Sequence, residues 1–183
     1  MDGFSFLFSL YSLLLGLAVA HVITGFADNW VDRASTAPGV SSILLGVLIL
    51  LRAAGQWTSF WEGRDSLTMD PWMVLICLGM ALPYIFAGRV MFPRADARYA
   101  SADDYYLENR RALMIALLIP TCISFASNIL FWGAAFLQAP LFITVKYVLP
   151  LAIPFALIFA ERPLWHRAGL GVLTVCAVAL MLP

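Results

Sequence analysis

Residues 4–26 read FSFLFSLYSLLLGLAVAHVITGF and contain no Asp, Glu, Lys or Arg. A helix needs about 20 predominantly apolar residues to cross the hydrocarbon core of a bilayer, which is about 30 Å thick. In lipid, a single segment can satisfy all of its own backbone polar groups only as a helix. The run therefore predicts a transmembrane α-helix.

Five more apolar runs follow this one along the chain. They cover residues 41–61, 71–92, 112–136, 140–160 and 164–182. Proline is favourable at the first position of a helix, because an N–H at that position would have no partner within the helix. The run that starts at Pro71 has such a beginning. The sequence thus predicts an all-α fold, a polytopic transmembrane bundle of about six helices that forms one domain over residues 1–183. The stretch 93–111 is the predicted cytoplasmic loop.

Composition supports this reading of the whole chain. Hydrophobic residues make up 62% and charged residues 12%, against about 45–50% and about 25% in soluble domains. Such a chain has too few polar side chains to cover a surface that faces water. Eleven basic and eleven acidic residues give a net charge of zero, so the sequence predicts no nucleic-acid partner.

The positions of the basic residues predict how the helices are oriented. The loops after the first, third and fifth helices hold eight of them: Arg33, Arg89, Arg94, Arg98, Arg110, Arg111, Arg162 and Arg167. The opposite loops hold only Arg64. Because cytoplasmic loops of membrane proteins accumulate Lys and Arg, we expect these three connections inside the cell and both termini outside.

Two cations lie within predicted spans. Arg52 lies near the middle of the second run, with Gln56 one turn further on, and Lys146 lies in the fifth run. A charge at the centre of a span costs about 2.5–3.5 kcal/mol on insertion scales, and no Asp or Glu lies within any run to offset it. With the expected orientation, Lys146 lies about 9 Å and Arg52 about 14 Å below the outer surface. One interpretation is a site for an anion or a lipid headgroup, and the other is that both side chains extend outward to the interface along their aliphatic stems.

A polar stripe on the fourth run is a second candidate region. Thr121, Ser124 and Asn128 recur at helical spacing, and such residues commonly form hydrogen bonds between transmembrane helices. The stripe predicts either contacts of this kind or a substrate pathway that includes Asn128. Prolines at 83, 120, 150 and 154 predict kinks in the third, fourth and fifth helices.

Tyr105, Tyr106, Arg110 and Arg111 precede the fourth run. Aromatic rings favour the headgroup region, and arginines on the cytoplasmic side attract anionic lipids. The segment predicts a lipid anchor, with a docking site for a partner protein as the alternative.

The sequence contains few residues that could bind a cofactor or catalyse a reaction. His21 and His166 are the only histidines, and both fall near the same predicted membrane surface, which leaves haem or pigment ligation as an alternative. The three cysteines lie in apolar runs without the spacing of a metal site. No nucleophile elbow, phosphate loop, HExxH helix or pair of intramembrane carboxylates occurs. We therefore expect no enzyme, no metal and no cofactor.

Three segments resemble a group of uncharacterised bacterial polytopic inner-membrane proteins. They are the Leu-Gly-Leu-Ala of residues 15–18, the aromatic-rich residues 56–61 and the Tyr-Tyr-Leu-Glu-Asn-Arg-Arg of residues 105–111. The resemblance covers roughly the first 120 residues. It implies a multi-pass protein of the bacterial inner membrane and brings no activity with it, and the shared pattern does not include Arg52 or Lys146.

The first hypothesis from these observations is a non-enzymatic integral membrane protein that binds or passes a small anionic or lipid-like substrate. Its substrate-binding residues would be Arg52, Gln56, Asn128 and Lys146. The alternative is an accessory or assembly subunit of a larger membrane complex, and a further alternative is a haem- or pigment-binding protein. Membrane lipids are the expected partners, together with a second copy of the chain or a larger complex.

Overall fold

The computed structural model describes residues 3–34, 36–65, 70–93, 99–133, 138 and 140–182. Within these residues the regular elements are helices, with one isolated parallel bridge between Ala37 and Ser101. The long helices are α1 (Gly3–Val31), α2 (Val40–Glu62), α3 (Pro71–Val90), α4 (Ala102–Trp132) and α7 (Pro163–Ala179). A short 3₁₀ helix, η1 (Asp32–Ala34), follows α1. The remaining elements are α5 (Pro140–Ile143), the π-helix η3 (Thr144–Val148) and α6 (Leu149–Phe159).

Five helical segments of the described chain are long and apolar enough to cross a membrane: α1, α2, α3, α4 and the continuous stretch Pro140–Phe159. We call this last stretch the fifth pass. The exteriors of these passes carry exposed large apolar side chains, such as Leu13, Leu130 and Phe155. The all-helical, multi-pass class predicted from the sequence agrees with these segments. The helix from the sixth run, α7, has 17 residues and is shorter than the other five.

The start of α4 corrects one predicted boundary. The helix begins at Ala102 rather than 112, so the predicted loop 93–111 is wrong for residues 102–111. Ser101 caps the helix, because its hydroxyl accepts the Asp103 N–H at 3.1 Å. Asp103 and Asp104 lie in the first turn, where negative charge stabilises a helix. Residues 94–98 of the predicted loop and residues 134–136 of the predicted fourth helix lie outside the described residues.

The fifth pass changes its helical form at Lys146. Residues Thr144–Val148 form a π-helical turn, in which the Leu149 N–H bonds to the Thr144 carbonyl. Pro150 follows directly. A proline cannot donate to the carbonyl four residues earlier, and its ring crowds that carbonyl. The predicted distortion of this helix therefore falls on the turn that carries Lys146.

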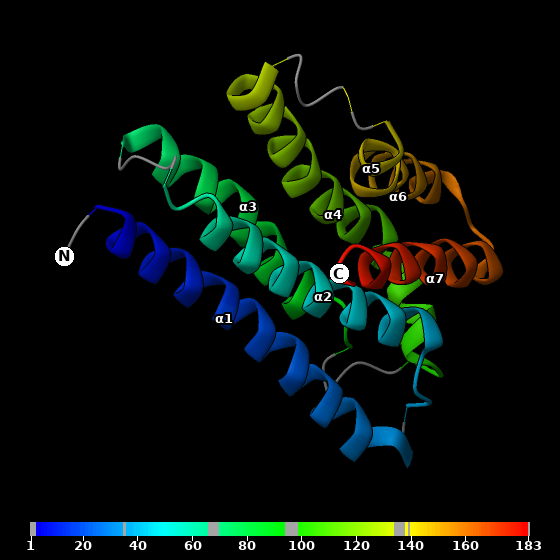
Figure 1. The fold of residues 1–183 in the computed structure, drawn as a ribbon. Coiled ribbons are helices and arrows are strands. Elements are labelled where there is room, and N and C mark those ends of the chain that lie inside the picture. The colour runs from blue at the N-terminus through cyan, green and yellow to red at the C-terminus, as the bar shows by residue number, and fades with distance from the viewer. Residues whose placement is uncertain are drawn as a thin grey trace.

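Consecutive passes run in opposite directions, and Figure 1 shows α1, α2 and α3 side by side in one half of the bundle. The beginning of α1 meets the end of α2, where the rings of Phe8 and Trp57 stack at 5.9 Å. The last helix, α7, lies along α2 and points the same way. Arg167 at its start binds beside Ser41, and Met181 just beyond its end lies beside Gly55. The interval from Ser41 to Gly55 and the interval from Arg167 to Met181 are both fourteen residues, or roughly 21 Å of helix. The helix α7 therefore follows α2 through much of the bundle.

Three connections meet at one end of the bundle. The Ala37 N–H donates to the Ala100 carbonyl at 3.2 Å, which joins the segment after η1 to the segment after α3. Arg110 and Glu161 approach to 3.7 Å, which joins α4 to the segment between α6 and α7. These are the arginine-rich connections that the sequence groups on one side. Their grouping agrees with the prediction, and the assignment of this end to the cytoplasm stays a prediction.

Candidate functional site

Arg52 lies on the wall of a small cavity in the middle of the bundle. The cavity has a volume of about 10 Å³, which is about the space that one water molecule requires. Helices α2, α3, α4, α6 and α7 all contribute to it. The lining residues are Leu48, Arg52, Tyr84, Leu117, Thr121, Pro150, Pro154 and Leu173.

Neither Arg52 nor Lys146 has a carboxylate in direct contact within the described part of the chain. The ion pairs found there join Arg64 to Asp65, Arg110 to Glu161 and Arg167 to Asp103. Arg52 itself is partly exposed. The central cation therefore retains hydrogen-bond donors that can meet a water molecule or a ligand.

Lys146 projects from the π-helical turn of the fifth pass toward aromatic rings. Its Nζ lies 4.9 Å from the centre of the Phe142 ring and 5.8 Å from that of Tyr147. Such contacts partly offset the cost of removing a cation from water. The charges of Arg52 and of Glu62, at the end of α2, both act on Lys146. The structure thus brings the two predicted cations into electrostatic range of each other from different parts of the sequence.

Gln56 belongs to the same polar group as Arg52. Gln56 lies one turn after Arg52 on α2, and both residues act on Tyr84 of α3. Tyr84 is almost wholly buried and lines the cavity. Sequence reasoning did not select Tyr84, because a tyrosine inside an apolar run resembles an ordinary core residue. Its position one residue after Pro83 gave no indication that it faces Arg52.

The polar stripe on α4 divides between two places. Thr121 lines the cavity, and its hydroxyl donates to the Leu117 carbonyl of its own helix at 2.9 Å. Asn128 donates from Nδ2 to the Ser124 carbonyl at 2.8 Å and is not among the cavity residues. The prediction that Asn128 joins Arg52 in one site is therefore not supported. The physical reason is that a short polar side chain inside a helix can bond to the carbonyl one turn earlier.

Tyr106 is not an interfacial residue, which corrects the predicted lipid anchor. Its side chain is fully buried, and its hydroxyl lies 2.9 Å from Nδ1 of His166. Tyr105 packs instead against the Tyr99 ring, with ring centres 5.1 Å apart. Adjacent residues of a helix point about 100° apart, so Tyr105 does not share the buried position of Tyr106. Tyr99 also donates to Glu108 at 2.6 Å, and this bond raises the pKa of Tyr99.

The two predicted arginines of this segment also separate. Arg110 donates to the Leu107 carbonyl at 2.9 Å and pairs with Glu161. Arg111 is exposed. Only Arg111 of the two keeps its side chain free of these internal contacts, so it is the better candidate for lipid or partner binding.

His166 has both ring nitrogens engaged. Nε2 lies 3.0 Å from the Ala160 carbonyl, and a carbonyl oxygen only accepts, so Nε2 carries the proton. In the neutral ring Nδ1 then accepts from the Tyr106 hydroxyl. Ligation of a haem or pigment by His166 would have to break one of these bonds. Within the described ranges, no group of three or more His, Cys, Asp or Glu side chains could hold a metal ion.

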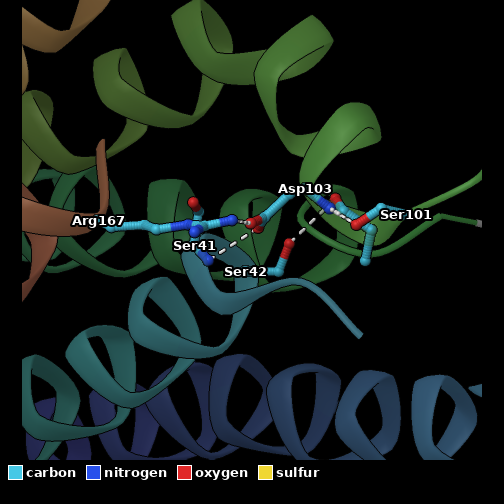
Figure 2. Close-up of polar contacts among 6 residues, drawn as sticks. Ser41, Ser42, Ser101, Asp103 and Arg167 are labelled. Atoms are coloured by element: carbon cyan, nitrogen blue, oxygen red, sulfur yellow. Dashed lines mark hydrogen bonds and ion pairs between the residues drawn. The ribbon is translucent and has the colours of Figure 1, made fainter. Parts of the chain in front are cut away.

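The strongest polar cluster of the described chain surrounds Asp103, and Figure 2 shows it. Oδ1 of Asp103 accepts the Ser41 N–H at 2.8 Å, and Oδ2 lies 3.0 Å from a guanidinium nitrogen of Arg167. Ser42 donates from its hydroxyl to the Ala102 carbonyl at 3.3 Å. We call Ser41, Ser42, Ser101, Asp103 and Arg167 the Asp103 junction. It ties together the first turns of α2, α4 and α7.

Asp103 acts as a helix cap supplied by another helix. The residue before α2 is Gly39, which has no side chain to cap it, and the carboxylate of Asp103 takes that role. The N-terminus of a helix favours a negative charge, and Arg167 neutralises the buried carboxylate. The fit is close, since a Cβ on Gly39 would lie 2.5 Å from the Asp103 nitrogen. Sequence reasoning missed this cluster because its members lie 62 and 64 residues apart along the chain.

Comparisons with known proteins leave the chain without an established relative. No family model, no curated protein and no solved structure matches it. The resemblance to uncharacterised bacterial inner-membrane proteins therefore stays a prediction.

Proposed function

We propose that this chain is a non-enzymatic multi-pass protein of the bacterial inner membrane that binds and passes a small anionic or lipid-like substrate. The binding site is the group formed by Arg52, Gln56, Tyr84 and Lys146. One observation carries the proposal. Arg52 borders a cavity that five helices enclose, and no ion pair in the described chain includes Arg52 or Lys146.

The arrangement of Arg52 favours a site over simple outward extension. A cation that only needs to reach the interface extends along the exterior of its helix. Arg52 instead borders a cavity that five helices enclose. Lys146, with its Nζ over the Phe142 ring, is compatible with either role and would act as the outer cation of the pair.

Passage of a substrate requires the helices to move. A cavity of about 10 Å³ has room for about one water molecule and is too small for a phosphate or carboxylate group. The fifth pass is the wall best suited to move, because Pro150 and Pro154 both line the cavity and the π-helical turn precedes them. Turns of this kind are often found at functional sites.

Anion binding can be tested by thermal unfolding of the purified protein in mild detergent. The probes are inorganic phosphate and a short-chain phosphatidic acid, added in separate series. A ligand that binds only the folded state stabilises it by about 2.7 kcal/mol at 100 times its Kd. We expect one series to raise the unfolding temperature, and we expect Arg52→Gln and Lys146→Met to remove that rise.

The matched control is Arg64→Gln, which removes an exposed arginine near the end of α2. It should leave the stabilisation intact. A response to phosphatidic acid alone would identify the substrate as lipid-like, and a response to phosphate as a small soluble anion. Equal stabilisation of the wild type and both site variants would refute the proposal.

A second candidate function, an accessory subunit of a membrane complex, is favoured by a different observation. Asp104, Glu108 and Arg111 on the first turns of α4 are all exposed. They form a mixed-charge face that a simple lipid anchor does not need. Copurification of a partner in stoichiometric amount, lost in Arg111→Gln together with Glu108→Gln, would support this function over the first.

A further inference from the structure

The end of the bundle opposite Lys146 is closed by two successive layers. We infer that the Asp103 junction is a latch that holds the substrate path shut at this end, an inference that rests on the proposed function. The inner layer is apolar, and the outer layer is the ion pair between Asp103 and Arg167.

The apolar layer extends from the wall of the Arg52 cavity, which Leu48, Leu117 and Leu173 line, toward the junction. Its side chains come from α2, α4 and α7 and are at most 5% exposed: Leu45, Leu48, Leu113, Leu117, Leu170 and Leu173. All six belong to the main hydrophobic core. No anion can pass this layer unless α2, α4 and α7 separate.

Those three helices are the ones that the junction ties together. Figure 2 shows Ser41 and Ser42 on α2 and Arg167 on α7 meeting Asp103 and its neighbour Ser101 at the start of α4. One carboxylate contacts both partner helices, with Oδ1 on Ser41 and Oδ2 on Arg167. Release of Asp103 would therefore break its contacts with α2 and α7 in a single step.

Two features distinguish a latch from a permanent cap. The Arg167 side chain is 46% exposed while that of Asp103 is 8% exposed, so water can replace Asp103 as the partner of the guanidinium. The Ser41 hydroxyl is buried without a hydrogen-bond partner in the described part of the chain. The closed state therefore leaves one polar group unsatisfied. Opening would expose this hydroxyl to water, which would supply a hydrogen-bond partner.

Access to the cavity can be measured with a cysteine at Thr121, which lines the cavity. Thr121→Cys is made in a chain whose Cys77, Cys122 and Cys176 are replaced by Ala. The protein is placed in vesicles of both orientations and treated with the membrane-impermeant, anionic sulfonatoethyl methanethiosulfonate. We expect labelling from the Lys146 side, and slow labelling from the Asp103 side.

The latch is then opened by Asp103→Asn or Arg167→Gln. Because the labelling rate follows the population of the open state, we expect it to rise roughly tenfold from the Asp103 side for each variant. Asp104→Asn is the matched control, since it removes the same charge from the adjacent, exposed position. It should leave the rate unchanged.

Arg167→Gln keeps the Asp103 bond to Ser41, so it retains the helix cap if Asp103→Asn fails to fold. Folded Arg167→Gln protein that labels from the Asp103 side like the wild type would overturn the latch. The proposed function would survive that result, because labelling from the Lys146 side still reports its site. Absence of labelling from the Lys146 side would overturn the passage itself, and the latch with it.

Discussion

The hydroxyl of Tyr106 lies 2.9 Å from Nδ1 of His166, and the two rings meet edge to face with centres 5.3 Å apart. This contact joins α4 to α7 inside the bundle, where both side chains are fully buried. Among the described residues, the Tyr106 hydroxyl is the polar partner of Nδ1 and the Ala160 carbonyl is that of Nε2.

Tyr106→Phe should therefore destabilise the protein. The change removes one hydroxyl and leaves Nδ1 of His166 without its donor, which costs about 1–3 kcal/mol. Unfolding in mixed detergent micelles would measure the loss. Tyr105→Phe, one residue earlier and partly exposed, is the control and should change stability little. Equal effects of the two substitutions would contradict the buried contact.

Gly39→Ala should weaken the Asp103 junction without altering any charge. A Cβ at this position would lie 2.5 Å from both the backbone nitrogen and Oδ1 of Asp103. Overpacking of this kind typically costs about 1–3 kcal/mol. Gly16→Ala is the comparison, because nothing lies within 4 Å of its new Cβ. In the middle of α1 it should stabilise the helix by about 0.5–1 kcal/mol, and the same unfolding assay distinguishes the two signs.

Arg110 and Arg111 should respond differently to replacement by Gln. Arg110 lies against α4 and Glu161, so its loss should lower the unfolding temperature. Exposed Arg111 should instead contribute about 1 kcal/mol to the attraction of anionic lipid. Retention of phosphatidylglycerol on the purified protein, measured by native mass spectrometry, would fall only in Arg111→Gln. A fall in both variants would restore the predicted two-arginine anchor.

Orientation is testable at two exposed acidic positions that lie at opposite ends of the bundle. Asp65 follows α2 and Asp104 starts α4. Because the arginine-rich connections should lie in the cytoplasm, an impermeant thiol reagent should label Asp65→Cys in intact cells. It should label Asp104→Cys only after the membrane is opened. The reverse pattern would place both termini inside.

The sequence predicts the apolar segments well because hydrocarbon thickness sets their length. It predicts helix ends poorly. A hydropathy run marks the part of a helix that lies in lipid, whereas caps and charges mark where the helix begins. Ala102 starts α4 ten residues before the apolar run for this reason, and α1 continues to Val31, beyond the predicted end at residue 26.

The candidate site was predictable in part. A charge inside an apolar run costs free energy wherever the run packs, so Arg52 and Lys146 were recognisable without a structure. Tyr84 was not, because its role depends on α3 facing Arg52 across the cavity. The contact between Asp103 and Arg167 depends on how the first turns of α4 and α7 meet, for which no local sequence pattern exists.

The Asp103 contact also has a consequence for biosynthesis. Arg167 leaves the ribosome 64 residues after Asp103, so a carboxylate that docks at the head of α2 during synthesis does so before its cationic partner is made. Until α7 arrives, the nascent chain carries a poorly neutralised acid among packed helices. A product truncated before residue 167 would keep that defect, and membrane quality-control proteases could recognise it as unfinished.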